Sequence, residues 1–152
     1  MKKLSVLFLA LLIMLCGCAA EKAPVNCLEA ANAIKASCGF QELDEMSRSY
    51  ITKYLGIDDA LLADAVMLRD ASRATPEMIL LLTAAKQGDV KALETAVSDF
   101  HSTQLEEYRD YQPDEMPKLE NAKVTVNGRM IALIVSPDAD KTDAALKTAW
   151  NK

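Results

Sequence analysis

The stretch that decides the fold is residues 123–135, Lys-Val-Thr-Val-Asn-Gly-Arg-Met-Ile-Ala-Leu-Ile-Val. It holds Asn127-Gly128 between two apolar runs. This dipeptide is the strongest short-range signal for a two-residue β-hairpin, because both central residues of a type I′ turn need a positive φ angle. The sequence therefore predicts two antiparallel strands joined by a type I′ turn at Asn127-Gly128.

The predicted hairpin has two unequal faces. The turn pairs Val126 with Arg129 and Val124 with Ile131, and side chains alternate between the faces from there. The first face is apolar and is expected to join the core. It carries Val124, Val126, Ile131, Leu133 and Val135. The second face mixes polar and apolar side chains. It carries Lys123, Thr125, Met130, Ala132 and Ile134. Either an N-terminal helix covers this second face or it meets another molecule, so Met130, Ala132 and Ile134 form a candidate interaction face.

The N-terminal half has clear and ambiguous segments. Residues 27–38 carry apolar side chains at helical spacing and end at Gly39, a typical C-cap residue. The segment 43–54 shows a weaker helical pattern. The short apolar runs at 61–69 and 78–83 fit a helix or a buried strand equally well, because periodicity alone does not separate the two.

Two further helices are predicted around the hairpin. Residues 90–111 form the clearest amphipathic pattern in the chain, with Asp89 as N-cap and Pro113 just beyond the end. After the hairpin, Ser136-Pro137-Asp138 ends the second strand and starts a helix that reaches Trp150. We expect Trp150 to pack this last helix onto the domain.

The first residues have the pattern of an export signal. Lys2 and Lys3 precede an apolar run over residues 4–15, which is shorter than the ~20 residues that span a bilayer. Leu15-Cys16-Gly17-Cys18 then resembles the lipobox of bacterial lipoproteins, in which an aliphatic and a small residue precede an invariant cysteine. The resemblance implies a diacylglyceryl group on Cys18 and cleavage just before it.

This resemblance divides the chain into a signal peptide (1–17), an acylated cysteine with a tether (18–26) and one domain (27–152). It implies a protein anchored at the outer face of the cytoplasmic membrane, with membrane lipid as the partner of Cys18. Two acyl chains hold a protein on a membrane where one chain holds it only marginally. The alternative is an ordinary signal peptide cleaved after Ala19 or Ala20, which would leave a free secreted protein.

The charge of the chain bears on its partners. The 152-residue sequence has a net charge of −5, and the loss of residues 1–17 would remove two lysines and no acidic residue. The sequence contains no arginine-rich run or basic patch. We therefore expect no nucleic-acid partner and no electrostatic docking to anionic lipid.

No catalytic or metal-binding pattern stands out, and no cofactor is expected. His101 is the single histidine, and neither P-loop glycine spacing nor a nucleophile elbow is present. Cys27 and Cys38 share one predicted helix face at about 16 Å, too far apart for a disulfide. We predict two buried structural cysteines, with a redox or intermolecular role as the alternative.

Several motifs resemble one family, domain-of-unknown-function family 4358, whose members are small lipoproteins found mainly in Gram-positive bacteria. The segment Tyr54-Leu55-Gly56-Ile57-Asp58 resembles the Tyr-Gly-Ile-Asp turn of that family, with Leu55 as an insertion. The other similar pieces lie in the C-terminal half. They are Tyr111, Pro113, Lys-Leu-Glu-Asn-Ala at 118–122, the hairpin, and Val-Ser-Pro-Asp-Ala-Asp-Lys at 135–141.

The resemblance covers about residues 40–150 and implies strands near 62–71 and 77–84. The implied architecture is α+β: N-terminal helices, a β-hairpin, a long amphipathic helix, a second β-hairpin with the Asn-Gly turn and a C-terminal helix. A small antiparallel sheet is packed by these helices. The family has no established activity, so the resemblance transfers no catalytic residue.

The resulting hypothesis is a non-catalytic, lipid-anchored module that binds an envelope protein or a small ligand. Two alternatives stay open. The first is a structural component of the cell envelope. The second is an envelope enzyme or thiol redox protein that uses Cys27, Cys38 or His101.

Overall fold

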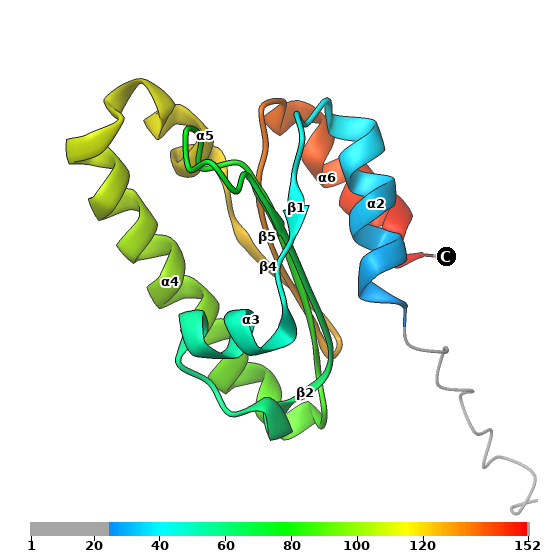
Figure 1. The fold of residues 1–152 in the computed structure, drawn as a ribbon. Helices are drawn as coiled ribbons and strands as arrows, with labels where there is room; N and C mark the ends of the chain where they lie inside the picture. Colours follow the sequence, from blue (N-terminus) through cyan, green and yellow to red (C-terminus); the bar gives the residue numbers. More distant parts are fainter. Residues whose placement is uncertain (1–24, 152) are drawn as a thin grey trace, which may run out of the picture.

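The computed structural model describes residues 25–151, which fold into three layers (Figure 1). A central sheet separates two groups of helices. Helices α3 (Arg48–Leu55), α4 (Val90–Tyr111) and α5 (Met116–Asn121) lie on one face. Helices α2 (Cys27–Cys38) and α6 (Ala139–Trp150) lie side by side on the other. This arrangement confirms the predicted α+β class.

The sheet is antiparallel throughout, in the order β1-β2-β3-β5-β4. Its strands are β1 (Asp44–Glu45), β2 (Leu62–Arg69), β3 (Met78–Ala84), β4 (Val124–Asn127) and β5 (Met130–Val135). Every residue of β3 is buried, because this strand is central and has helices over both faces. The two ambiguous apolar runs are therefore strands, in agreement with the order that the family resemblance implied.

The segment predicted as a weak helix at 43–54 is only partly helical. Its first residues form β1, where Asp44 pairs with Arg69 and Glu45 with Leu68. Helix α3 begins after Ser47, whose hydroxyl accepts a hydrogen bond from the backbone N–H of Tyr50. The helical prediction was wrong for residues 44–45 because their backbone pairs with a strand that is distant in sequence.

The register of the C-terminal hairpin also differs from the prediction. Val124 pairs with Leu133 and Val126 with Ile131, so the two central turn residues are Gly128 and Arg129. Of these two, only Gly128 has a positive φ, of 59°. A positive φ at the first central position alone is the pattern of a type II′ turn rather than type I′. The shift does not change which side chains share a face.

The first face of the hairpin packs against α4, but not all of it is core. Ile131, Leu133 and Val135 are buried as predicted, whereas Val124 is half-buried and Val126 is 39% exposed. Both valines lie on β4, the edge strand, which explains their exposure. The prediction that the whole first face is core was therefore wrong for β4.

The predicted stripe of α4 is confirmed except at its end. Its buried residues are Val90, Leu93, Val97, Phe100, Gln104 and Tyr108. Tyr111 is 77% exposed because the C-terminal part of α4 diverges from the sheet (Figure 1). At the other end, the Asp89 carboxylate accepts a hydrogen bond from the backbone N–H of Lys86 and so closes a short 3₁₀ turn before the helix.

The second face of the hairpin is covered. Ala132 and Ile134 are 1% and 4% exposed and belong to a core cluster with residues of α2 and α6. Trp150 packs against the same cluster, as predicted. The candidate interaction face at Met130, Ala132 and Ile134 is therefore corrected, since only Met130 is half-buried and the other two are core. The open alternative that an N-terminal helix covers this face is confirmed, with α6 packed beside that helix.

Candidate functional site

An open groove of about 950 Å³ lies between α3 and α4. We call it the α3–α4 groove. Its lining includes Tyr50, Tyr54, Ile57, Ala96, Phe100 and Gln104. It thus contains the turn Gly56-Ile57-Asp58 that follows α3, where Gly56 ends the helix with a φ of 64°.

Aromatic rings form one wall of this groove. Tyr50 and Tyr54 are four residues apart on α3, so their rings share a helix face and stack with centroids 4.9 Å apart. Phe100 from α4 meets Tyr54 edge-on at 5.5 Å. Offset-stacked and edge-to-face pairs are the favoured arrangements of aromatic rings. The wall is therefore held in place by α3 and α4 together.

A buried arginine lies behind this wall. Arg69, the last residue of β2, is 4% exposed. One of its Nη atoms donates to the Tyr50 hydroxyl at 3.0 Å, and its guanidinium carbon lies 5.6 Å from the centre of the Tyr54 ring. Among residues 25–151, no carboxylate lies within ion-pair distance of Arg69. This is unusual, because buried charges are normally paired.

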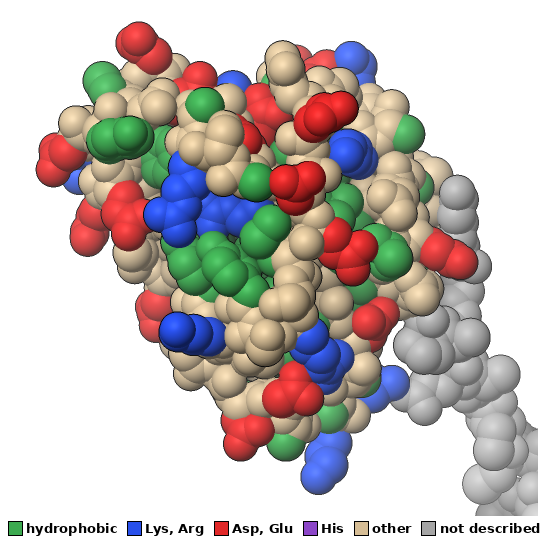
Figure 2. Space-filling model, viewed as in Figure 1, with side chains coloured by type: hydrophobic (Ala, Val, Ile, Leu, Met, Phe, Trp, Pro, Cys, Tyr) green, Lys and Arg blue, Asp and Glu red, His purple; other side chains and the backbone are tan. Residues whose placement is uncertain are grey.

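A second arginine approaches the same hydroxyl group. Arg73 is exposed in the turn between β2 and β3, where its φ is 58°. Its hydrogen bond with Tyr50 raises the pKa of its guanidinium. The Glu107 carboxylate of α4 also raises this pKa, so Arg73 has an acidic side chain in its surroundings. Figure 2 shows Lys and Arg side chains gathered beside an apolar hollow between α4 and β1.

The nearest acidic residue in the sequence does not neutralise these arginines. The Asp70 carboxylate accepts hydrogen bonds from the hydroxyl and backbone N–H of Ser72, at 2.6 and 2.8 Å, and from the backbone N–H of Thr75 at 3.0 Å. These bonds, led by the Ser72 hydroxyl, hold the pKa of Asp70 below its ordinary value. Asp70 therefore shapes the turn that carries Arg73.

Helix α4 connects the groove to the β2–β3 turn. Gln104 is 2% exposed, and its side-chain amide donates to the Glu107 carboxylate at 2.9 Å. Tyr108 donates to the backbone carbonyl of Thr75 at 2.9 Å, which ties the β2–β3 turn to α4. Burial raises the pKa of Tyr108, so this hydroxyl stays protonated and keeps its role as a donor.

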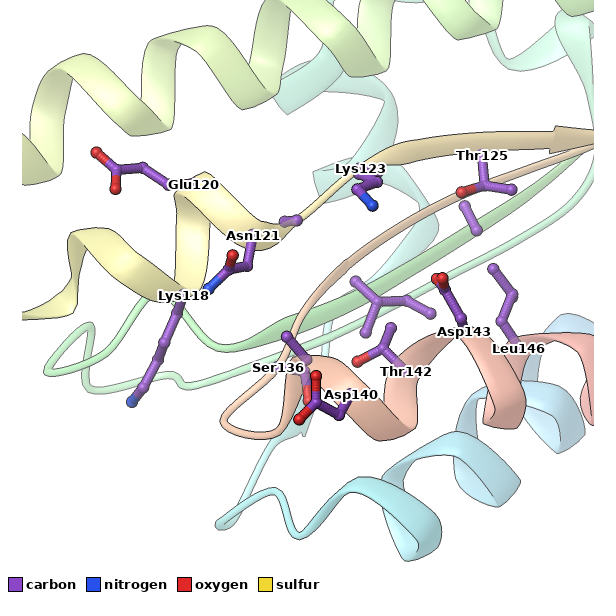
Figure 3. A pocket seen from close by; sticks show the side chains of 14 residues that line it. Lys118, Glu120, Asn121, Lys123, Thr125, Ser136, Asp140, Thr142, Asp143 and Leu146 are labelled. Carbon is purple, nitrogen blue, oxygen red and sulfur yellow. The ribbon is translucent and has the colours of Figure 1, made fainter.

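A smaller pocket of about 330 Å³ lies between the β4–β5 hairpin and α6 (Figure 3). Ala132 and Ile134 line it, as do Thr125 and Asp143 from opposite sides. Two residues of the predicted interaction face thus border a hollow although they are buried, whereas Met130 does not line it.

One charged residue that lines this smaller pocket, Lys118, is already paired. Lys118 forms ion pairs of 2.8 Å with Glu77 and with Glu115, and Glu77 is 3% exposed. The remaining charged groups are of both signs, with Lys123 against Glu120, Asp140 and Asp143. We therefore favour the α3–α4 groove, which combines a larger volume with an aromatic wall. Arg69 is buried behind that wall and is not part of the lining.

The alternative site residues are not brought together. Cys27 and Cys38 lie at opposite ends of α2, and both are free and buried. Cys27 contacts the Thr83 hydroxyl at 3.4 Å, and burial raises the pKa of the Cys27 thiol to about 12. His101 lies across the sheet on α4, where its Nε2 atom is 2.9 Å from the carbonyl oxygen of Leu119 on α5.

Neither a metal site nor a membrane span is found in the described part of the chain. Within residues 25–151, no three His, Cys, Asp or Glu side chains are grouped so that they could hold a metal ion. In the same range, no helix has both the length and the apolar character needed to span a bilayer. Cys18, the predicted lipidation site, lies outside the described residues.

Sequence reasoning missed the α3–α4 groove. The spacing of Tyr50 and Tyr54 indicated a helix face, and Arg69 ended an apolar run that fitted a helix or a buried strand equally well. A charged residue directly after a buried apolar run was the one local signal available. It did not reveal that Tyr50, nineteen positions earlier, supplies the hydrogen bond to Arg69.

Comparison with known proteins identifies one family. No curated protein and no solved structure matches the chain. The family model of the domain of unknown function DUF4358 matches residues 36–136. This segment contains the whole sheet and the helices that form the α3–α4 groove, but not most of α2 or any of α6. The chain therefore belongs to the DUF4358 family of domains of unknown function.

Proposed function

We propose that this protein is a non-catalytic binding module, held at the outer face of the cytoplasmic membrane by an acylated Cys18. The α3–α4 groove is its binding site. The observation that carries the proposal is an open groove with a wall of packed aromatic rings. Behind this wall the Arg69 side chain is buried without a carboxylate partner in residues 25–151. Binding sites typically combine an apolar lining with a few polar groups that orient the ligand.

The groove has the features of a preformed site. Its aromatic wall is fixed by ring contacts between α3 and α4, and Tyr108 ties the adjoining turn to α4. A preformed site loses little conformational entropy when a ligand binds. The non-catalytic part of the proposal rests on the separation of Cys27, Cys38 and His101, because catalytic partners need to approach hydrogen-bond distance.

The anchoring part rests on the lipobox pattern around Cys18. The nine residues 18–26 span at most about 32 Å when fully extended, so the domain is expected to stay close to the lipid surface. Replacement of Cys18 by Ala is expected to move the protein from the salt-washed membrane fraction to the soluble fraction. If the C18A variant stays in the washed membranes, lipidation at this residue is ruled out as the anchor.

The binding site is tested by crosslinking in intact cells. A photoreactive amino acid replaces Thr103, an exposed residue that lines the groove, or Ser102, its exposed neighbour outside the lining. We expect a specific adduct from position 103 that is absent from position 102 and is lost when Ala96→Trp fills the groove. Equal adducts from both positions, or adducts that persist with A96W, would contradict the assignment of this groove.

A further inference from the structure

We infer that the α3–α4 groove docks a basic amphipathic helix of a partner protein. The apolar stripe of that helix lies in the groove, and its lysine or arginine side chains face Asp99 of α4. This inference rests on the proposed function and names the class of partner. It follows from the shape, the walls and the charge of the groove.

The groove runs along one face of α4. Ala92, Ala96, Asp99, Thr103 and Glu107 line it at intervals of three and four residues, which is the spacing of a single helix face. From the first to the last of these residues, α4 extends by about 22 Å. A small molecule is normally enclosed over most of its surface, and an open groove of this length does not enclose one. An elongated partner that lies along α4 fits the shape better.

The walls of the groove favour a helix over an extended peptide. An extended peptide binds mainly by pairing its backbone with the free edge of a sheet. The groove is bordered instead by α3 and α4, whose backbone groups are hydrogen-bonded within each helix. A docked helix satisfies its own backbone hydrogen bonds and places a stripe of side chains in the groove. Ile57, Leu61 and Phe100 supply apolar contacts for that stripe.

The charges of the lining favour a basic partner. Three carboxylates line the groove against one lysine, and none of these four side chains forms an ion pair within residues 25–151. The carboxylates are Asp58, Asp99 and Glu107, and the lysine is Lys53. Glu107 already has Arg73 in its surroundings, and Asp58 caps the short 3₁₀ turn that follows α3. Asp99 is therefore the main carboxylate that remains for a partner.

The same charges disfavour two other occupants of the groove. An anionic membrane surface would be repelled by the carboxylates that line it. A two-fold dimer formed through this groove would bring the acidic α4 faces of two copies together. A basic segment of a different protein avoids both repulsions.

The inference is tested with three synthetic peptides on the full-length protein in phosphatidylcholine nanodiscs, at about 150 mM salt. The first peptide has about fifteen residues, with leucine and lysine at helical spacing. The second has glutamate at each lysine position, and the third is the first with a central proline, which breaks the helix. Binding is followed by NMR through the methyl groups of Ile57 and Leu61, which line the groove. Empty nanodiscs measure how much of each peptide binds lipid.

We expect the lysine peptide to bind at least five-fold more tightly than the glutamate or proline peptide. Ala96→Trp, which fills the groove, is expected to abolish the response of both methyl groups to the lysine peptide.

Two matched variants assign the charge effect to the groove. Asp99→Asn removes an exposed carboxylate from the lining, and Asp110→Asn removes an exposed carboxylate of α4 outside it. The two positions are about 16 Å apart along the helix, which exceeds the Debye length of about 8 Å at this salt concentration. We expect D99N to weaken binding of the lysine peptide about two- to five-fold and D110N to leave it unchanged. Lys53→Gln removes the positive charge of the lining and is expected to strengthen the same binding.

Four outcomes would overturn the inference. Equal affinity for the lysine and glutamate peptides would show that the partner is not selected by basic charge. Equal affinity for the lysine and proline peptides would show that it does not dock as a helix. Equal effects of D99N and D110N would reduce the preference to general charge. If the lysine peptide left both methyl signals unchanged, this class of partner would be excluded.

Failure of the proposed function is read separately, from the crosslinks at position 103. A specific adduct at this position without peptide binding would keep the groove as a binding site and reject only the basic helix as its partner.

Discussion

At the scale of single residues, the most informative side chain is Arg69. This residue is 4% exposed, and its guanidinium group has one hydrogen bond to a phenol and one contact with an aromatic face. When the acceptor of a buried charged donor is removed, the protein loses more stability than an exposed hydrogen bond contributes, because no water replaces the lost partner. Tyr50 is therefore expected to stabilise the fold, and this contribution can be measured without a ligand.

Replacement of Tyr50 by Phe is expected to lower the free energy of unfolding by about 1–3 kcal/mol, since Arg69 loses its hydrogen-bond acceptor. Urea unfolding followed by circular dichroism measures this change. Tyr111→Phe is the matched control, because Tyr111 is 77% exposed and its hydroxyl supports nothing buried. Equal stability of Y50F and Y111F would mean that water satisfies Arg69.

The thiol of Cys27 makes stability depend on pH. Burial raises its pKa from 9.0 to about 12, so the folded state holds a proton that the unfolded chain releases. The resulting stabilisation is fully present below about pH 9 and is lost as the pH rises toward about 12. We expect the wild-type protein to lose more stability than Cys27→Ala between pH 8 and pH 11. Parallel curves from urea unfolding at both pH values would contradict this.

At the scale of elements, the C-terminal hairpin shows how a turn sets register. Because the central residues are Gly128 and Arg129, β4 and β5 pair two positions away from the predicted register. Side-chain direction has a period of two along a strand, so a shift by two leaves each residue on its predicted face. The face assignment was therefore right although the turn type was wrong.

The turn type predicts that alanine substitutions at Gly128 and at its neighbour Asn127 lower stability by different amounts. Gly128 has a φ of 59°, and a Cβ atom added there would meet no other atom within 4 Å. Gly128→Ala is therefore expected to cost about 1–2 kcal/mol from backbone strain alone. Asn127→Ala is expected to change stability by less than about 0.5 kcal/mol, because this exposed residue does not need a positive φ. Equal costs at both positions, measured by thermal unfolding, would favour the type I′ turn instead.

At the scale of the whole molecule, the two helical layers have different roles. The layer of α3, α4 and α5 leaves an open groove, whereas α2 and α6 pack together and bury the second face of the sheet (Figure 1). The family match ends at residue 136, before α6 begins. The second face of the sheet is thus covered largely by parts of the chain outside the matched segment.

This coverage predicts opposite results for two lysine substitutions on one strand. Ile134→Lys places a charge in a core site that is 4% exposed, and is expected to abolish cooperative unfolding or to lower stability by more than about 4 kcal/mol. Met130→Lys, at the half-buried end of β5, is expected to cost about 1 kcal/mol. Circular dichroism during heating compares the two. A well-folded I134K protein would show that α2 and α6 do not cover this site in solution.

The sequence by itself determined what local physics controls. Helical spacing located α2 and most of α4, an alternating pattern sorted the hairpin faces, and Gly39 and Pro113 marked where helices end. Only the tertiary structure decided the pairing of β1, the cover over Ala132 and Ile134, and the site around Arg69. These features depend on contacts between residues far apart in the chain, and short-range periodicity carries no information about which distant element supplies the partner.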